Sequence, residues 1–335
     1  MAPKLFATGT TGYVGGDFLA LLLETHPEWA IHITCLVRDQ ARGESLKATY
    51  PGLRLVYGTL DDGEILEDEA AKAEIVLHFA SSDHVGAAEA ISRGLRKSGG
   101  YWIHTSGTDV LLLQPSEGHK DVKTFDDWDG IKQCTGRPDS APHRPVDKVV
   151  LAAAASSSIK TAIVCPSLIY GEGRGPGNRR SMQAYELSRL ILERGAGFVI
   201  GKEDYMWFNV HIYDLSRLYL SLLEAAVAGG GKASWNDEGY YLVENGEHRW
   251  NELAQEVTNE AHKQGLIKSA EAKILEIEEK DKLKAIGVAL WNVKSRAKAI
   301  RASRLLGWKP NERSLMAEVP DIVGSEAKRI GIAST

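Results

Sequence analysis

A glycine-rich turn near the N-terminus constrains this chain more than any other feature. The apolar run 5–8 leads into TGTTGYVGG, where Gly9, Gly12 and Gly15 precede an amphipathic helix expected over 13–24. Such a turn reverses the chain tightly, lets the backbone approach a pyrophosphate and lets the helix pack on the strand, and each demand excludes a Cβ atom. The helix N-terminus offers free N–H groups to phosphate. The strand–turn–helix context therefore predicts a dinucleotide-binding site.

The first half of the chain alternates short apolar runs with helical patterns. We expect strands over 5–8, 31–37, 53–57, 75–79, 101–106 and 161–165, and helices over 13–24, 65–72, 86–97 and 146–156. This alternation predicts βαβ units and a Rossmann-type, doubly wound parallel sheet of the α/β class. We assign 1–165 to an NAD(P)-binding domain. A smaller, mixed substrate-binding lobe is expected over 166–335, with 207–227 returning to the first domain and Asp214 capping a helix there.

Charge and composition exclude several classes of protein. A formal net charge of -5 argues against a nucleic-acid partner, which would need a basic face. No apolar run approaches the roughly 20 residues of a membrane helix, and the N-terminus lacks the pattern of a signal peptide. The three cysteines have no metal-ligand spacing, and their odd number fits a reducing compartment. We expect a cytoplasmic protein with no metal site.

Five segments together resemble the short-chain dehydrogenase/reductase superfamily in its extended or atypical form, which includes epimerases and dehydratases. They are the GxxGxxG turn, HFAS at 78–81, PSLIYG at 166–171, VHIYDL at 210–215 and LGWKP at 306–310. The resemblance covers almost the whole chain and implies an NAD(P) cofactor. It assigns these residues to the cofactor site: Gly9, Thr11, Gly12, Tyr13, Val14, Gly15, Phe79, Ala80, Ser81 and Pro166.

The residues after the second strand bear on the choice of cofactor. An acidic residue there binds the ribose 2′-OH of NAD, whereas an arginine accommodates the 2′-phosphate of NADP. Arg38 follows the strand directly, with Arg42 close behind, and favours NADP over NAD. Asp39 is the ribose acceptor if the strand ends one residue later. A separate alternative is that Arg38 is only a solvated surface charge. Asp61 either contacts the adenine or caps the next helix.

The catalytic residues that the resemblance implies are only partly present. Family enzymes use a serine or threonine, a tyrosine and a lysine four residues after the tyrosine. Lys148 matches the lysine, which also holds the nicotinamide ribose, but the tyrosine position is Arg144. Arginine does not deprotonate in proteins, so it cannot replace a phenol as general acid or base. The hydroxyl position falls near Gly107, beside Ser106 and Thr108, which either reach a substrate oxygen or bond the backbone at a strand end.

Other side chains are candidates for the missing proton donor. His143 precedes the vacant position and titrates near neutrality, and Tyr170 carries a phenol near the substrate cleft by analogy with the family. Arg174, Arg179 and Arg180 either hold an anionic substrate or are solvated loop charges. The acidic-aromatic stretch 126–130 is either a lid over the cofactor or, preferably, a solvated loop.

Three functions follow from this pattern. The leading hypothesis is an NADP(H)-dependent oxidoreductase acting on a small carbonyl compound or alcohol. The missing tyrosine leaves two alternatives open: a non-enzymatic NAD(P) sensor that regulates a protein partner, and a non-redox lyase or cyclase that uses His143, Arg144 and Tyr170. By analogy with the family, helices 86–97 and 146–156 are candidates for a homodimer contact.

Overall fold

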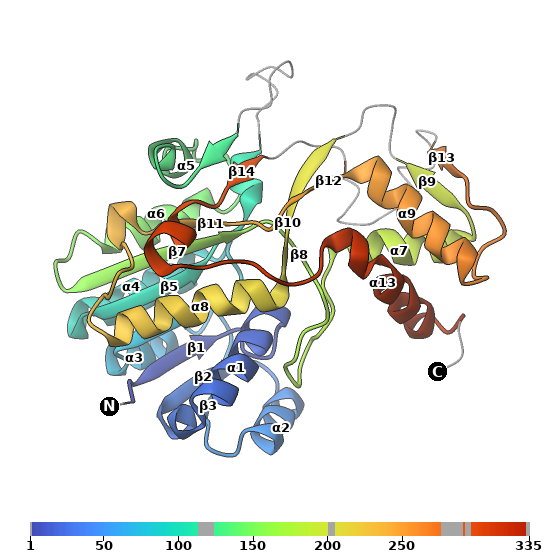
Figure 1. Cartoon of the computed structure of the whole chain (residues 1–335). Helices are drawn as coiled ribbons and strands as arrows, with labels where there is room; N and C mark the ends of the chain where they lie inside the picture. The colour runs from blue at the N-terminus through green and yellow to red at the C-terminus, as the bar shows by residue number, and fades with distance from the viewer. Residues whose placement is uncertain (1, 113–123, 200–204, 276–290, 292–295, 333–335) are drawn as a thin grey trace.

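A seven-stranded sheet forms the centre of the computed structural model, which describes residues 2–112, 124–199, 205–275, 291 and 296–332 (Figure 1). The strands lie in the order β3-β2-β1-β4-β5-β7-β11, and all neighbours are parallel. Their bounds are β1 (Leu5–Thr8), β2 (Ile33–Val37), β3 (Arg54–Tyr57), β4 (Ile75–His78), β5 (Gly100–Thr105), β7 (Ile159–Pro166) and β11 (Tyr240–Val243). The order reverses between β1 and β4, which confirms the predicted doubly wound, Rossmann-type sheet.

Helices cover both faces of this sheet, which explains why its strands are almost continuously apolar. On one face α1 (Tyr13–Thr25) packs against α8 (Ile212–Val227), with Phe18 and Tyr219 in a shared core. On the other face lie α3 (Gly63–Lys72), α4 (Val85–Ser98) and α6 (Arg144–Ala153), whose core includes Ile91 and Val150. The segment 207–227, assigned to the first domain, supplies α8 to this body.

The sequence patterns missed one helix near the cofactor turn and misplaced one cap. Helix α2 (Gln40–Thr49) buries only Gly43 and Leu46, so it carries no apolar stripe that would have revealed it. Helix α8 is capped by His211, whose imidazole accepts the Tyr213 N–H, and not by Asp214. The prediction for Asp214 was wrong because its carboxylate is buried and accepts backbone N–H groups of the segment near Asn311.

A second, smaller lobe has its own core. It contains α7 (Gln183–Arg194), α9 (Trp250–Lys263) and α13 (Leu315–Arg329), which gather at the right of Figure 1. Beside them lie the sheet β12-β10-β8 and the pair β13-β9. Their bounds are β8 (Leu168–Tyr170), β9 (Gly197–Val199), β10 (Met206–His211), β12 (Glu247–Arg249) and β13 (Ala272–Ile274). From the same half of the chain, β11 joins the central sheet and α12 (Arg301–Leu306) packs on β11 and α8.

The acidic-aromatic stretch after β5 is neither a lid nor a solvated loop. It forms β6 (Phe125–Asp126), which pairs with β14 (Ala297–Lys298) and is followed by α5 (Ile131–Thr135). Asp127 is completely buried and accepts the backbone N–H groups of Leu242, Ile300 and Arg301 at 2.8–3.0 Å. Three such donors offset the cost of burying a carboxylate, which the sequence pattern could not show. Among the described residues no helix is long and apolar enough to cross a membrane.

Candidate functional site

The glycine turn forms a cradle at the carboxyl end of β1. Gly12 is the N-cap of α1, and Gly9 has a φ of +76°, which side chains disfavour. A Cβ atom on Gly9 would lie 2.6 Å from the carbonyl carbon of Phe79, and one on Gly15 would lie 2.5 Å from the Gly9 oxygen. The turn is therefore pressed against the end of β4, with the N–H groups of α1 at its rim. This geometry fits a dinucleotide pyrophosphate.

A cavity of about 270 Å³ opens from this turn toward the ends of β2 and β3. Seven of the residues assigned to the cofactor by sequence line it: Gly9, Thr11, Gly12, Arg38, Phe79, Ala80 and Ser81. The lining also contains residues that the sequence analysis did not assign: Thr8, Leu36, Arg42, Gly58, Thr59 and Leu60. Most of these follow β2 or β3, so the rule that ligands bind at the carboxyl ends of parallel strands could have found them.

The three charged residues after β2 have different surroundings. Arg38 and Arg42 both line the cavity. Asp39 is the N-cap of α2, and its carboxylate accepts the Arg42 N–H at 2.9 Å. The side chain of Asp39 therefore has a structural role in which it satisfies a free donor of the first helical turn.

Several other predicted cofactor residues lie outside the cavity lining. Asp61 is 89% exposed and pairs with His84 at 3.0 Å, while the neighbouring Asp62, and not Asp61, is the N-cap of α3. The Tyr13 hydroxyl donates to the Gly171 carbonyl at 2.6 Å, and burial raises its pKa. Val14 lies beside Tyr13 in the first turn of α1, and Pro166 ends β7.

The two candidate hydroxyls beside Gly107 are buried. Ser106 donates to the Asp147 carboxylate at 3.1 Å, and Thr108 begins the short helix η2 (Thr108–Leu111). Burial raises the pKa of Asp147 to about 6, although the Ser106 hydroxyl partly opposes this shift. Ser106 is thus engaged by an internal carboxylate of α6.

The remaining catalytic candidates are also engaged. The Lys148 ammonium, on α6, binds the Asp139 carboxylate at 2.7 Å, and its side chain is 48% exposed. The Tyr170 hydroxyl donates to the Arg313 carbonyl at 2.7 Å, and burial raises its pKa above the ordinary value of a phenol. The structure therefore places Tyr170 in the core of the second lobe, with its hydroxyl bonded there, which disfavours the proposed role as proton donor.

His143 lies where the ends of β4 and β5 meet the start of α6. Its Nδ1 is 2.8 Å from the Asp83 carboxylate and 3.0 Å from the Ser82 hydroxyl. Its other ring nitrogen faces Gly107, because a Cβ atom on that glycine would lie only 3.0 Å from Nε2. The imidazole is 14% exposed, and His143 has a φ of +62°, a conformation unusual for a residue with a side chain.

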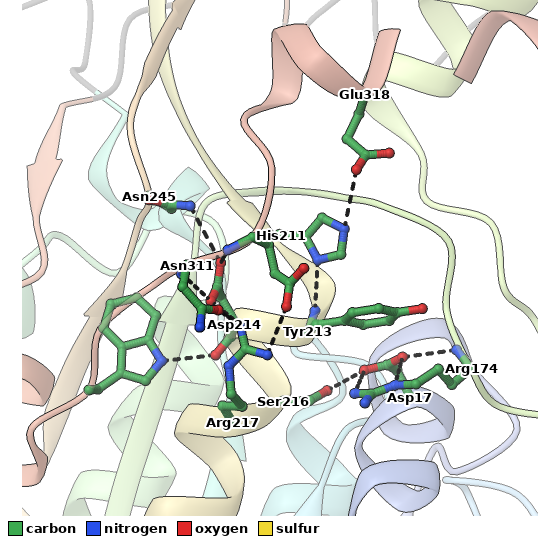
Figure 2. Close-up of polar contacts among 12 residues, drawn as sticks. Asp17, Arg174, His211, Tyr213, Asp214, Ser216, Arg217, Asn245, Asn311 and Glu318 are labelled. Atoms are coloured by element: carbon green, nitrogen blue, oxygen red, sulfur yellow. Dashed lines mark hydrogen bonds and ion pairs between the residues drawn. The ribbon is translucent and has the colours of Figure 1, made fainter. Parts of the chain in front are cut away.

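The arginines of the glycine loop are paired within the protein and do not form a free anion site. Figure 2 shows Arg174 against Asp17, which also accepts the Ser216 hydroxyl. Arg179 pairs with Glu172 at 3.0 Å, and Arg180 pairs with the buried Glu326 at 2.6 Å. Arg174 and Arg180 are therefore not solvated loop charges, because each is paired with a buried carboxylate, whereas Arg179 lies in an exposed pair.

Figure 2 also shows Asp214 at the start of α8, where it holds the segment that leads into α13. The Trp308 indole donates to the Asp214 carbonyl at 2.9 Å, and the Arg217 guanidinium binds the Asp214 carboxylate. These contacts hold the segment 308–312 on the start of α8. Among the described residues no cluster of three or more His, Cys, Asp or Glu side chains could hold a metal ion.

Comparison with known proteins places this geometry in a family. No protein-family model matches the chain. The oxidase ucsJ of an Acremonium species is 37% identical over 350 residues, which cover 99% of this chain and all of that protein. A dTDP-glucose 4,6-dehydratase of Mycobacterium tuberculosis is 32% identical over 82 residues, or 24% of this chain.

Solved structures share the fold over almost the full length. A UDP-glucose 4-epimerase of Thermotoga maritima, solved with UDP-glucose, superposes with a TM-score of 0.67 at 15% identity and covers 97% of this chain and 99% of its own. The dTDP-glucose 4,6-dehydratase DesIV of Streptomyces venezuelae, solved with NAD, superposes with a TM-score of 0.66 at 18% identity and covers 97% of both chains. The chain belongs to the same family as the Acremonium oxidase, and it shares the fold of these epimerases and dehydratases.

Proposed function

We propose that this protein is an NADP(H)-dependent oxidoreductase that acts on a small carbonyl compound or alcohol. The choice of NADP(H) rests on the different positions of the arginines and the aspartate that follow β2. Arg38 and Arg42 line the cavity, whereas the Asp39 carboxylate is bonded to the first turn of α2. Two guanidinium groups suit a 2′-phosphate, and a carboxylate that already accepts a backbone N–H is less available to a ribose hydroxyl.

The other residues of the site have roles that fit this proposal. The N–H groups of Tyr13 and Val14, in the first turn of α1, would hold the pyrophosphate, and Gly9 and Gly15 leave room for it. Phe79, Ala80 and Ser81 line the way from the adenosine end toward the reacting end. Lys148 would bind the nicotinamide ribose after its ammonium leaves the exposed partner Asp139. When bound, the reduced cofactor supplies a hydride, and a carbonyl substrate then needs one proton at its oxygen.

Binding calorimetry with NADPH and NADH in parallel tests the choice of cofactor. We expect tighter binding of NADPH, and Arg38→Ala and Arg42→Ala should each weaken it by about 10- to 100-fold, the effect of one charge-assisted hydrogen bond. Their effect on NADH should be small because it lacks the 2′-phosphate. Arg93→Ala is the matched control, since Arg93 lies on α4 and pairs with Glu67. Equal or tighter binding of NADH would overturn the choice.

The absence of a tyrosine at the family's catalytic position favours a second candidate function, that of a cofactor sensor without turnover. Arg144 occupies that position, and its Nε donates to the Arg137 carbonyl at 3.0 Å. In a sensor, dinucleotide binding changes the affinity of the protein for a protein partner, and no carbonyl compound is turned over. A broad screen of carbonyl compounds and alcohols with NADPH and NADP⁺ separates the two functions. Turnover that needs no dinucleotide would instead favour the lyase or cyclase.

A further inference from the structure

We infer that an Asp83–His143 pair is the proton-transfer device of this site and replaces the absent tyrosine. The inference rests on the proposed oxidoreductase function and names the residues that move the proton. Two positions that carry hydroxyls in related enzymes are here Gly107 and Arg144. The imidazole of His143 occupies the space next to Gly107 that a side chain there would fill.

Position is the first argument for this pair. Ser81 lines the cavity, and the hydroxyl of the next residue, Ser82, is 3.0 Å from Nδ1 of His143. His143 is therefore connected through Ser82 to the lining of the cavity, at the carboxyl edge of the sheet near β4 and β5. Ligands of doubly wound folds bind along this edge. A residual exposure of 14% leaves the ring accessible from one side.

Orientation is the second argument. The Asp83 carboxylate accepts from Nδ1 at 2.8 Å and from the His143 backbone N–H at 3.2 Å, so it fixes both the ring and its backbone. An ionised carboxylate can only accept, and it therefore selects the form with a proton on Nδ1. The Nε2 atom, which faces Gly107, is left to exchange the proton with a substrate. Asp83 is thus a positioning residue and His143 the catalytic residue.

Backbone strain at His143 is the third argument. Its φ of +62° costs of order 1 kcal/mol for a residue with a side chain and persists only where other contacts hold it. His143 is also the N-cap of α6 but makes no side-chain capping bond, so capping does not explain the choice of histidine. Its side chain is held by Asp83 and Ser82, and its carbonyl accepts the N–H groups of Val146 and Asp147 in the first turn of α6.

The proton balance is simple. In carbonyl reduction the Nε2–H bond of the imidazolium breaks and an O–H bond forms on the substrate oxygen, while the ring becomes neutral and later takes a proton from water. Alcohol oxidation runs the same step in reverse, with neutral Nε2 as the base. The titratable or charged groups around the ring are Asp83, Asp109, Asp147, His104 and Arg144.

Substitution of His143 in the full chain tests the pair. His143→Asn is the informative variant because asparagine tolerates a positive φ. With the best carbonyl substrate from the screen, it should lose at least about 100-fold in kcat, and added imidazole should restore part of the loss. NADPH affinity should stay unchanged. His32→Asn, at an exposed position on the 3-10 helix Pro27–His32, is the matched control.

A second readout does not depend on turnover. In ¹⁵N-labelled protein the His143 Nδ1–H should give a downfield proton resonance that disappears in Asp83→Asn, and this variant should lose kcat with its pH–rate profile displaced. Wild-type kcat in His143→Asn, or an Nδ1 resonance insensitive to Asp83, would overturn the pair and leave the oxidoreductase function standing. A wild-type protein that binds NADPH but turns over no substrate would overturn the function, and the pair with it.

Discussion

Arg174 binds Asp17 at a point where three segments distant in sequence meet. The Arg174 guanidinium donates to both carboxylate oxygens at 3.0 and 2.8 Å, and its backbone N–H donates at 2.9 Å. Ser216 on α8 completes the shell of the Asp17 carboxylate, which is fully buried. The guanidinium also lies over the Tyr213 ring, 4.1 Å from its centroid. This cluster holds the glycine loop on the first helix of the cofactor site.

Removal of Arg174 should therefore destabilise the protein strongly. Arg174→Ala leaves a buried carboxylate with no countercharge, which costs about 3–5 kcal/mol. Arg179→Ala in the same loop breaks the exposed pair with Glu172 and one hydrogen bond to the Gly173 carbonyl, and it should cost less than about 2 kcal/mol. Urea unfolding of both variants measures the difference. Similar midpoints for the two would contradict the structural role of Arg174.

Gly9 should tolerate no side chain. Gly9→Ala adds a Cβ atom 2.6 Å from the Phe79 backbone at a φ of +76°, so either the turn or the end of β4 must move. We expect loss of NADPH binding together with a lower melting temperature. Gly229→Ala is the control, because its φ is +75° but no atom lies within 4 Å of its Cβ position, and it should cost only about 1 kcal/mol. Calorimetry and thermal unfolding separate the effect of the clash from that of φ.

The buried Asp147 should make stability depend on pH. Burial raises its pKa to about 6, above the value of about 4 in an unfolded chain. The favourable contribution of this group is therefore complete below about pH 4 and is lost as the pH rises through 6. The free energy of unfolding of Asp147→Asn should exceed that of wild type by about 3 kcal/mol at pH 7, and the two values should converge near pH 4. Asp129 is exposed, so Asp129→Asn is the control. In denaturant titrations its free energy of unfolding should equal that of wild type at every pH.

Lys148 should matter for turnover more than for folding. Its ammonium is partly exposed and pairs with the exposed Asp139 carboxylate, so Lys148→Ala should change stability by less than about 1 kcal/mol. If Lys148 holds the nicotinamide ribose, the same variant should reduce kcat/KM by at least about tenfold. Asp139→Asn frees the ammonium and should leave kcat/KM equal or higher. Unchanged steady-state kinetics in Lys148→Ala would remove this lysine from the site.

The sequence by itself determined the fold and the position of the candidate dinucleotide site. Both depend on local patterns: apolar strands alternate with amphipathic helices, and the spacing of Gly9, Gly12 and Gly15 follows from what a turn between strand and helix can accommodate. The first and last strands of the predicted parallel run, β1 and β7, lie in the central sheet as expected.

Only the tertiary structure decided which polar side chains are available and which are already bonded. The sequence left open whether Asp39 binds a ribose and whether Arg174 binds a substrate, but in the structure Asp39 caps α2 and Arg174 is bound to Asp17. Asp83 and His143, sixty residues apart, meet because β4 and β5 are adjacent and α6 begins at their carboxyl ends. Contacts of this kind depend on the juxtaposition of distant segments, and no local pattern in the chain encodes them.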